Sequence, residues 1–326
     1  MKQYKRKVMD KYKKAKLDHI SPKVLETGHN YDFPIYKDLG DSIYAIFLSK
    51  DEKLDQDHFE KLQEENIKDL FINHNDHDKY SKEITNYLSK ILDDTTQPTL
   101  LKSEIMHELA SDTMHDLLHS DITVEKIEKV SKTVDDTVHF ILNDPKAVKS
   151  MLYVTTHDYY TYTHSIDVST YALGFGAYLG LNETQLRILG KGGMLHDLGK
   201  KKIPLEIINK DGKLDDNEFE IMKKHPIYGV KILKEMGETN DMVCTIIEQH
   251  HEKLDGTGYP KGLKADKIHP FAQIMAICDI FNALTTKRSY KNALSSFEAF
   301  KIMHDYMKDE LNLKLLSKFI SFMGNN

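Results

Sequence analysis

Histidine and aspartate residues recur through the C-terminal half of the chain at intervals of about one helix and one turn. The gaps between successive residues or adjacent pairs are 32, 28, 25 and 28 residues. A lone histidine on a helix is usually a core residue, but one ligand-type residue or pair on each successive helix is not explained that way. Helical bundles place metal sites on inward-facing positions, so the pattern predicts a metal centre. The set is His164, His196, Asp197, His225, His250, His251 and Asp279.

The number of these side chains favours two metal ions over one. A zinc site takes about three or four protein ligands, so this larger set suits two ions with one carboxylate bridging them. Two divalent cations and two aspartates leave a formal charge of about +2, which favours a phosphate ester as substrate. Imidazole and carboxylate suit iron, manganese or zinc, and the residues do not separate these metals. Neither cysteine belongs to the set.

Helices must position these residues, and the sequence after Pro145 is helical in pattern. We expect helices over 159–179, 182–197, 215–236 with a disturbance at Pro226, 241–251 and 270–285, then a final helical pair. The stretch 252–269 contains several glycines and prolines and is expected to be a loop. Three capping boxes mark helix starts: Asn182 with Gln185, Asp215 with Glu218, and Ser295 with Glu298.

The N-terminal part has a different texture. Residues 32–36 and 42–48 read as a β-hairpin, 69–72 as a further strand, and 55–65 and 80–92 as amphipathic helices. Residues 1–20 are basic and are expected to form a solvated helix, and 98–142 a connecting helix or helical pair. The predicted fold is therefore mainly α. It comprises a small α+β domain over 1–95, which we expect to be regulatory, a helical linker over 96–144, and an all-helical catalytic bundle over 145–326.

Composition limits the class of protein further. The chain has 326 residues and a formal net charge of −6, which argues against duplex nucleic acid as a partner. No apolar run approaches the roughly 20 residues of a membrane-spanning helix, and no secretory signal is visible. Two cysteines, Cys244 and Cys278, suit a reducing compartment. We therefore expect a cytoplasmic protein without a transmembrane segment.

Two motifs carry a resemblance to a known family. Residues 194–200, MLHDLGK, followed by Ile203-Pro204, are similar to the signature of the HD superfamily of metal-dependent phosphohydrolases. Residues 250–260, HHEKLDGTGYP, resemble the defining element of its HD-GYP family, the bacterial cyclic di-GMP phosphodiesterases. The resemblance extends over roughly 145–322. A bare His-Asp pair has little specificity, whereas the longer element in register with the other ligands is highly specific.

The resemblance implies a role for each matching residue. His164, His196, Asp197 and Asp279 would hold one metal and His225, His250 and His251 the other, with Asp197 bridging. Asp197 and Lys200 would be the catalytic residues. Lys200, Arg288 and Lys291 would contact substrate phosphate, as directional anion ligands do. In the loop, Gly256 and Gly258 permit tight backbone, and Tyr259 would either stack on guanine or pin the loop.

The sequence also departs from the family pattern. Tyr160 stands where some members have a glutamate that binds a third metal, so we expect a two-metal centre. Lys253 replaces the usual arginine after HHE, and Ser289 the usual proline after the phosphate-binding arginine. Neither position belongs to the ligand set. Both departures lie in or near the predicted loops, so the family's loop geometry is not carried over to this chain.

The expected function is hydrolysis of cyclic di-GMP to pGpG, GMP or both, by attack of a hydroxide that bridges the two metals. The resemblance makes iron the expected metal, with manganese and zinc as alternatives and no organic cofactor. One alternative is hydrolysis of another cyclic dinucleotide, such as cyclic GMP-AMP. Another is a non-catalytic adaptor that binds cyclic di-GMP. A diguanylate cyclase or a second copy of the chain are candidate partners.

Overall fold

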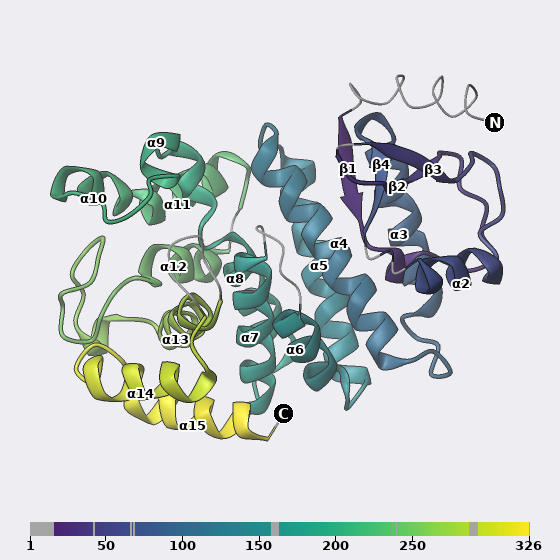
Figure 1. Ribbon diagram of the computed structural model, residues 1–326. Helices are drawn as coiled ribbons and strands as arrows, with labels where there is room; N and C mark the ends of the chain where they lie inside the picture. The colour runs from purple at the N-terminus through teal and green to yellow at the C-terminus, as the bar shows by residue number, and fades with distance from the viewer. Residues whose placement is uncertain are drawn as a thin grey trace. The chain divides into compact units, whose positions relative to one another are not determined.

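The structure is a computed structural model that describes residues 16–325 except 42, 66, 68, 158–162, 239 and 287–292. The chain divides into two compact units, Met1–Leu109 and Ala110–Asn326. Most of the described chain is helical, with one small antiparallel sheet near the N-terminus (Figure 1). The predicted mainly α fold class is therefore confirmed.

The first unit contains a four-stranded antiparallel sheet in the order β1-β4-β2-β3. Phe33 and Tyr80 of α3 meet edge to face, with ring centroids 6.5 Å apart, so the helix shares a core with residues next to the sheet. The elements are β1 (Leu17–Ile20), 3₁₀ helix η1 (Pro22–Val24), β2 (Ile35–Asp38), β3 (Tyr44–Leu48), α2 (Gln56–Glu64), β4 (Leu70–Asn73), 3₁₀ helix η2 (His74–Asp76) and α3 (His77–Ile91).

The predicted hairpin, the later strand and both helices of this unit are confirmed, with boundaries shifted by a few residues. The expectation of a helix over 1–20 is wrong for its last four residues, which form β1. Leu17 pairs with Asn73 and Ile20 with Leu70 of β4. Ile20 is buried. Pairing with a neighbouring strand therefore decides the conformation of this segment; residues 1–15 lie outside the described residues.

Two long helices, α4 (Thr99–His119) and α5 (Val124–Asn143), occupy the region predicted as a helical connection. Helix α4 begins in the first unit and ends in the second. Thr123 caps α5 by accepting a hydrogen bond from the backbone N–H of Lys126. The apolar residues of α5 lie on a buried stripe that includes Val130, Val134 and Val138.

The rest of the second unit is helical. Its elements are α6 (Ala147–His157), α7 (His164–Tyr178), α8 (Glu183–Leu195), 3₁₀ helix η3 (Leu198–Lys202), α9 (Leu205–Ile208), α10 (Asp216–Met222), α11 (His225–Glu235), α12 (Asp241–Gln249), 3₁₀ helix η4 (Ala265–Lys267), α13 (Pro270–Thr285), α14 (Ser296–Tyr306) and α15 (Leu313–Gly324). All three predicted capping boxes are present.

Two helix predictions need correction. The single helix expected over 215–236 is two, α10 and α11, and Pro226 lies in the first turn of α11. Proline favours that position because its missing N–H needs no partner there. The helix expected over 159–179 begins at His164, with Thr163 as its N-cap residue; residues 158–162 lie outside the described part. Threonine favours helix ends over helix interiors.

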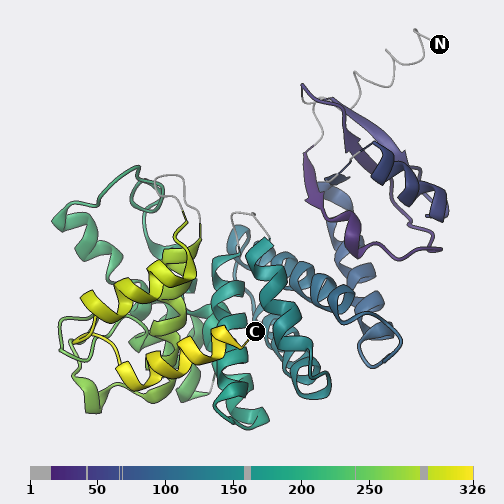
Figure 2. The ribbon, with the colours of Figure 1, turned by 60° about the horizontal axis from the view of Figure 1, so that its bottom comes forward.

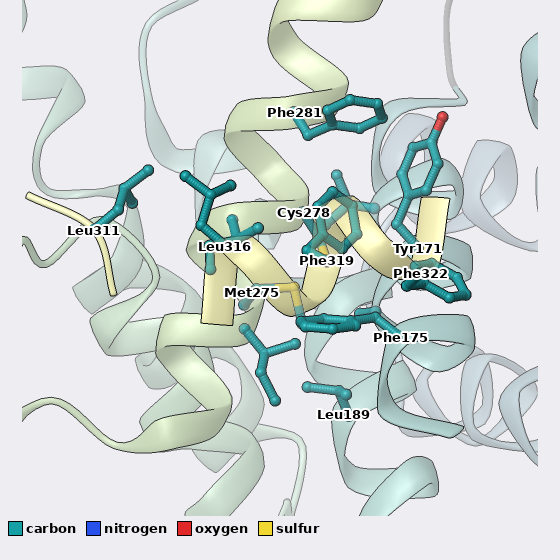
Figure 3. Close-up of a cluster of buried hydrophobic side chains, with 14 of the residues drawn as sticks. Tyr171, Phe175, Leu189, Met275, Cys278, Phe281, Leu311, Leu316, Phe319 and Phe322 are labelled. Atoms are coloured by element: carbon teal, nitrogen blue, oxygen red, sulfur yellow. The ribbon is translucent and has the colours of Figure 1, made fainter. Parts of the chain in front are cut away.

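A cluster of aromatic and aliphatic side chains holds α7, α13 and α15 together (Figure 3). Phe175 of α7 and Phe319 of α15 meet edge to face at 5.1 Å, and Phe281 of α13 meets Phe319 at 5.3 Å. Figure 2 shows the yellow helices α14 and α15 beside α13. Since α7, α8 and α13 each carry or adjoin predicted ligands, this core fixes their positions.

Within the described ranges, no helix combines the length and the apolar character needed to cross a membrane.

Candidate metal centre

The predicted ligands lie almost entirely at helix ends of the second unit. His164 and His225 are the first residues of α7 and α11. His196 and Asp197 follow the last residue of α8, and His250 and His251 follow that of α12. Asp279 lies within α13. Because α8 packs against α7, α12 and α13, these ends meet in one place.

Three of the histidines are oriented by the same local hydrogen bond. The Nδ1–H of His196 donates to the carbonyl of Gly193 at 2.7 Å, that of His225 to Met222 at 2.8 Å, and that of His250 to Ile247 at 2.7 Å. A carbonyl only accepts, so Nδ1 carries the proton and Nε2 keeps its lone pair. All three residues are buried.

Among the described residues, these lone pairs have no suitable partner. Nε2 of His225 and Nε2 of His250 lie 3.3 Å apart, although each presents a lone pair to the other. Nε2 of His196 and Oδ1 of Asp197 are buried, and the described residues offer neither of them a hydrogen-bond partner. Burying such groups unpaired is costly. A cation between them would remove the cost, so the residues fit a metal.

The donor atoms form two groups, each compact enough to hold one ion. One group is His164, His196 and Asp197, and the other is Asp197, His225, His250 and His251. Asp197 belongs to both: its Oδ2 lies 3.5 Å from Nε2 of His196, and its Oδ1 lies 3.4 Å from Nε2 of His225. The two oxygens of one carboxylate therefore face different histidines.

Asp279 lies beside both groups rather than within either of them. Its Oδ1 is 3.2 Å from Nε2 of His164, and its Oδ2 is 3.9 Å from Nδ1 of His251. All seven predicted ligands thus meet at one centre, and their binding of metal stays a prediction.

The orientation of His164 depends on a buried relay. Its Nδ1 lies 2.7 Å from Oδ1 of Asn282, and Nδ2 of Asn282 donates to Oδ2 of Asp167 at 3.3 Å. Asn282 and Asp167 are both buried. The carboxylate fixes the direction of the amide, the amide oxygen accepts the Nδ1 proton, and Nε2 of His164 is left to face the centre.

Burial and mutual contacts set the charge state of the centre. Burial lowers the pKa of His225 and His250, and it lowers the pKa of His251 to about 3. Burial alone would raise the pKa of Asp197, but Lys200 and the nearby histidines outweigh it and hold that pKa well below its usual value. These imidazoles are therefore neutral and the carboxylate ionised near neutral pH, as metal binding requires.

Asp279 and His164 form a charged pair in the absence of metal. Burial opposes ionisation of Asp279, but the hydrogen bond from His164 outweighs it, so the pKa of Asp279 is lowered. Burial likewise works to lower the pKa of His164, and Asp279 reverses this, so the pKa of His164 is raised. A metal at His164 would displace that proton.

Lys200 lies at the same centre. Its Nζ is 2.5 Å from Oδ2 of Asp197, and its side chain is 38% exposed. The segment that carries both residues packs closely on α11, because a Cβ on Gly199 would lie 1.9 Å from the carbonyl oxygen of His225. Glycine at this position lets Asp197 approach His225.

The loop after His251 is held by its own backbone contacts. The buried Glu252 accepts hydrogen bonds from the backbone N–H groups of Lys261 and Leu263, at 2.7 and 2.8 Å. A Cβ on Gly258 would lie 2.3 Å from the backbone nitrogen of Lys253. Gly256 has a φ of +85°, a conformation that favours glycine.

Tyr259 packs against the centre rather than away from it. Its ring centroid lies 4.7 Å from that of His251 and 6.2 Å from that of His225. Burial raises the pKa of its phenol. The ring therefore lies beside the predicted ligands, and its role in pinning the loop or stacking on a base stays a prediction.

Some predicted positions cannot be placed. Arg288 and Lys291, the expected phosphate contacts, lie outside the described residues, as do Tyr160 and Ser289. Lys253 is described, and its Nζ pairs with Glu310 at 2.8 Å, away from the ligand set.

Sequence reasoning missed the residues that support the ligands. Asn282 follows Asp279 by three positions and Asp167 follows His164 by three, so each lies on the same helix face as its ligand. A polar residue at that spacing inside an apolar helix was the available signal. Nothing comparable pointed to Lys201, whose Nζ donates to the backbone carbonyls of Leu117, Leu118 and Ser120, because these partners lie more than 80 residues away in the sequence.

The helical part of the chain matches a known protein family. A family model described as the HD domain matches residues 139–313, more than half of the chain. The matched segment includes every predicted metal ligand.

Curated relatives are similar to about half of the chain. The protein named cyclic di-GMP phosphodiesterase PA4108 of Pseudomonas aeruginosa is 36% identical over 176 residues, which cover 54% of this chain and 42% of the relative. A cyclic di-GMP phosphodiesterase of Thermotoga maritima is 31% identical over 208 residues, 62% of this chain and 56% of the relative. A 3'3'-cGAMP-specific phosphodiesterase 1 of Vibrio cholerae is 37% identical over 144 residues, 44% and 33%. The chain thus spans less than two thirds of these relatives' lengths.

The fold also has a solved counterpart. Bd1817, an HDG"Y"P protein from Bdellovibrio bacteriovorus, aligns with a TM-score of 0.71 over 95% of this chain and 100% of that one, at 21% identity. At that identity the likeness concerns the fold alone.

Proposed function

The chain belongs to the HD domain family, and from that premise we propose that it is a metal-dependent phosphodiesterase acting on cyclic di-GMP. The observation that carries the proposal is Asp197, whose two oxygens face two separate groups of histidines. A bridging carboxylate of this kind suits two divalent ions, and we propose iron, with manganese or zinc as substitutes. The names of the Pseudomonas and Thermotoga relatives support the choice of substrate.

The chain's own residues have distinct tasks in this reaction. Bound divalent ions supply Lewis acidity toward a phosphodiester and lower the pKa of water. Lys200 is partly exposed beside Asp197 and can turn its Nζ toward a phosphoryl oxygen, where it would offset negative charge in the transition state. Lys200 is also the described side chain best placed to supply a proton to the leaving oxygen.

The more exposed side of the centre gives the substrate its approach. The rings of His164 and His251 are 27% and 26% exposed, whereas those of His196 and His225 are almost fully buried. A phosphate would therefore arrive beside His164, His251 and Lys200. We propose that Arg288 and Lys291 add cationic contacts there, and that Gly256, Gly258 and Tyr259 shape the loop.

The decisive experiment measures metal and product in the same sample. The full chain is purified without oxygen, its metal content is determined, and it is incubated with cyclic di-GMP before the products are separated. We expect two metals per chain and conversion to pGpG, GMP or both. Asp197→Ala should lose metal and turnover together, whereas Asp211→Ala, in an exposed turn, should keep both. Hydrolysis by metal-depleted Asp197→Ala would exclude this mechanism.

A second candidate is hydrolysis of cyclic GMP-AMP, which the names of several Vibrio cholerae relatives favour. The described centre contains no feature that separates guanine from adenine. Comparing kcat/KM for the two dinucleotides distinguishes these functions. A preference for cyclic GMP-AMP would replace cyclic di-GMP as the substrate and leave the metal chemistry unchanged.

The adaptor alternative predicts binding without chemistry. A scaffold has little use for seven metal-binding groups, four of which (His196, His225, His250 and Asp279) are buried at the cost of their hydration, so the ligand set favours the enzyme. Bound cyclic di-GMP without product over hours would favour the adaptor, whose partner could be a diguanylate cyclase or a second copy of the chain.

The cellular setting completes the proposal. Cys244 and Cys278 are buried free thiols, which suits the reducing cytoplasm. We propose that residues 1–95 form a regulatory domain, 96–144 a linker and 145–326 the catalytic domain.

A further inference from the structure

The carboxyl end of α4 is capped by a side chain that lies far away in the sequence. Nζ of Lys201 donates to the carbonyl oxygens of Leu117 and Leu118, both at 3.0 Å, and also to that of Ser120. Helix α4 ends at His119, so the carbonyls of Leu117 and Leu118 lack partners within the helix. A cation at this end is also favoured by the helix dipole.

Lys201 belongs to η3, the 3₁₀ helix that directly follows the predicted metal ligands His196 and Asp197. A 3₁₀ helix has about three residues per turn, so successive side chains point about 120° apart. Gly199 faces the start of α11, Lys200 faces Asp197 and Lys201 faces α4. Gly199 and Lys201 thus attach this short helix to two different parts of the second unit, and the intervening Lys200 contacts Asp197, the N-cap residue of the same short helix.

We infer that Lys201 is a positioning residue through which the carboxyl end of α4 sets the placement of Lys200 and Asp197. This inference rests on the proposed function, because it gives Lys200 a role in the reaction. The close contact at Gly199 prevents η3 from moving toward α11. The position of η3 on its other side depends on the hydrogen bonds of Lys201.

Helix α4 belongs to both units, so the contact with Lys201 links η3 to a helix that extends beyond the second unit. This helix begins at Thr99, in the span of the first unit, and ends in the second. A rotation or shift of its last turn moves the carbonyls to which Lys201 donates. Because Lys200 is the adjacent residue, its position would change as well.

The first test measures hydrogen exchange in the full chain and needs no substrate. Lys201→Met keeps the length of the side chain and removes its donors, and Lys202→Met is the matched control at an exposed neighbour in the same 3₁₀ helix. The backbone N–H of Lys200 donates to the backbone carbonyl of Asp197, and that of Ile203 to the backbone carbonyl of Lys200, both at 2.9 Å. In Lys201→Met we expect these amides, and those of the last turn of α4, to exchange roughly tenfold faster. Exchange at the wild-type rate in either segment would overturn the inference, whether or not the protein hydrolyses cyclic di-GMP.

The second test separates positioning from simple destabilisation. Lys201→Met should lower kcat about tenfold in the wild-type background and change it less than about twofold in Lys200→Met, since the effect passes through Lys200. Lys201→Arg should restore most of kcat, because a guanidinium can also donate to several carbonyls. Equal losses in the two backgrounds, or no rescue by arginine, would show that Lys201 does not act through Lys200.

Discussion

Four of the predicted histidine ligands are each oriented by a hydrogen bond from Nδ1. His164 differs from the other three because its acceptor is a side chain. Backbone carbonyls serve His196, His225 and His250, whereas Asn282 serves His164. A backbone acceptor cannot be removed by substitution, but Asn282 can. The preorganisation of one ligand can therefore be tested without touching any ligand.

We predict that Asn282→Ala weakens metal binding about 10- to 100-fold, as loss of an outer hydrogen-bond partner typically does. Without the amide oxygen, His164 can rotate and its Nε2 no longer points steadily toward the centre. Titration of the metal-free protein with Mn²⁺ measures the effect. Asn282→Asp combined with Asp167→Asn restores one acceptor and one donor and should recover part of the affinity. Unchanged affinity in Asn282→Ala would show that His164 is held by other contacts.

The buried neutral histidines predict acid sensitivity of the metal-free protein. The pKa of His251 falls from 6.5 to about 3 on folding, and those of His225 and His250 are also lowered. Below pH 6.5 the unfolded chain thus binds more protons than the folded one, and stability falls as the pH decreases toward 3. His164, whose pKa is raised, contributes with the opposite sign. The lowered pKa values of Asp197 and Asp279 add to the loss of stability as the pH falls below their ordinary value of 3.8.

Urea unfolding of the metal-depleted protein at several pH values measures this slope, which should be on the order of 1 kcal/mol per pH unit for each histidine involved. His251→Gln should reduce the slope. His304→Gln, at an exposed residue, should not. Stability that stays constant or rises on acidification would contradict the neutral, buried state of these rings.

Most of the predicted ligands lie at helix ends rather than in helix interiors. The sequence could therefore predict their convergence, because it marks where helices begin and end. Spacing of one ligand or pair per helix predicted convergence because adjacent helices in a bundle bring their ends together. Capping boxes predicted where α8, α10 and α14 begin. The break between α10 and α11 was missed because the apolar pattern continues through it, and only Pro226 hinted that His225 starts a new helix.

At the same scale, the loop after His251 owes its path to one close backbone approach. We predict that Gly258→Ala destabilises the protein by about 1–3 kcal/mol, because the added Cβ would lie 2.3 Å from Lys253 N and 2.5 Å from the His251 carbonyl oxygen. Displacement of that carbonyl should also weaken Mn²⁺ binding. Gly324→Ala, with nothing within 4 Å of its Cβ, is the matched control. Thermal unfolding and metal titration check both effects, and a Gly258→Ala protein as stable as wild type would mean that the loop relaxes freely.

Over the whole molecule, predictability differs between the two units. The second unit was foreseeable because its residues carry both a strong helical period and a specific motif. The first unit was foreseeable only in its local elements. Strand β1 was missed because Leu17–Ile20 gains its conformation from pairing with β4, whose paired residues lie 50 to 56 positions later in the sequence. The link made by Lys201 is similarly invisible in the sequence, since its acceptors are backbone carbonyls, which any residue could supply.

The distribution of ligands predicts how metal stabilises the chain. All candidate ligands lie in the second unit, between His164 and Asp279, so Mn²⁺ should stabilise that unit by about 2.7 kcal/mol at 100 times its dissociation constant. Hydrogen exchange with and without Mn²⁺ should show slower exchange in α7, α8, α12 and α13, and unchanged rates in the sheet of the first unit. Asp197→Ala should abolish the difference. Equal slowing of hydrogen exchange in β1–β4 would instead mean that the two units unfold together. Metal binding would then stabilise the whole chain rather than the second unit alone.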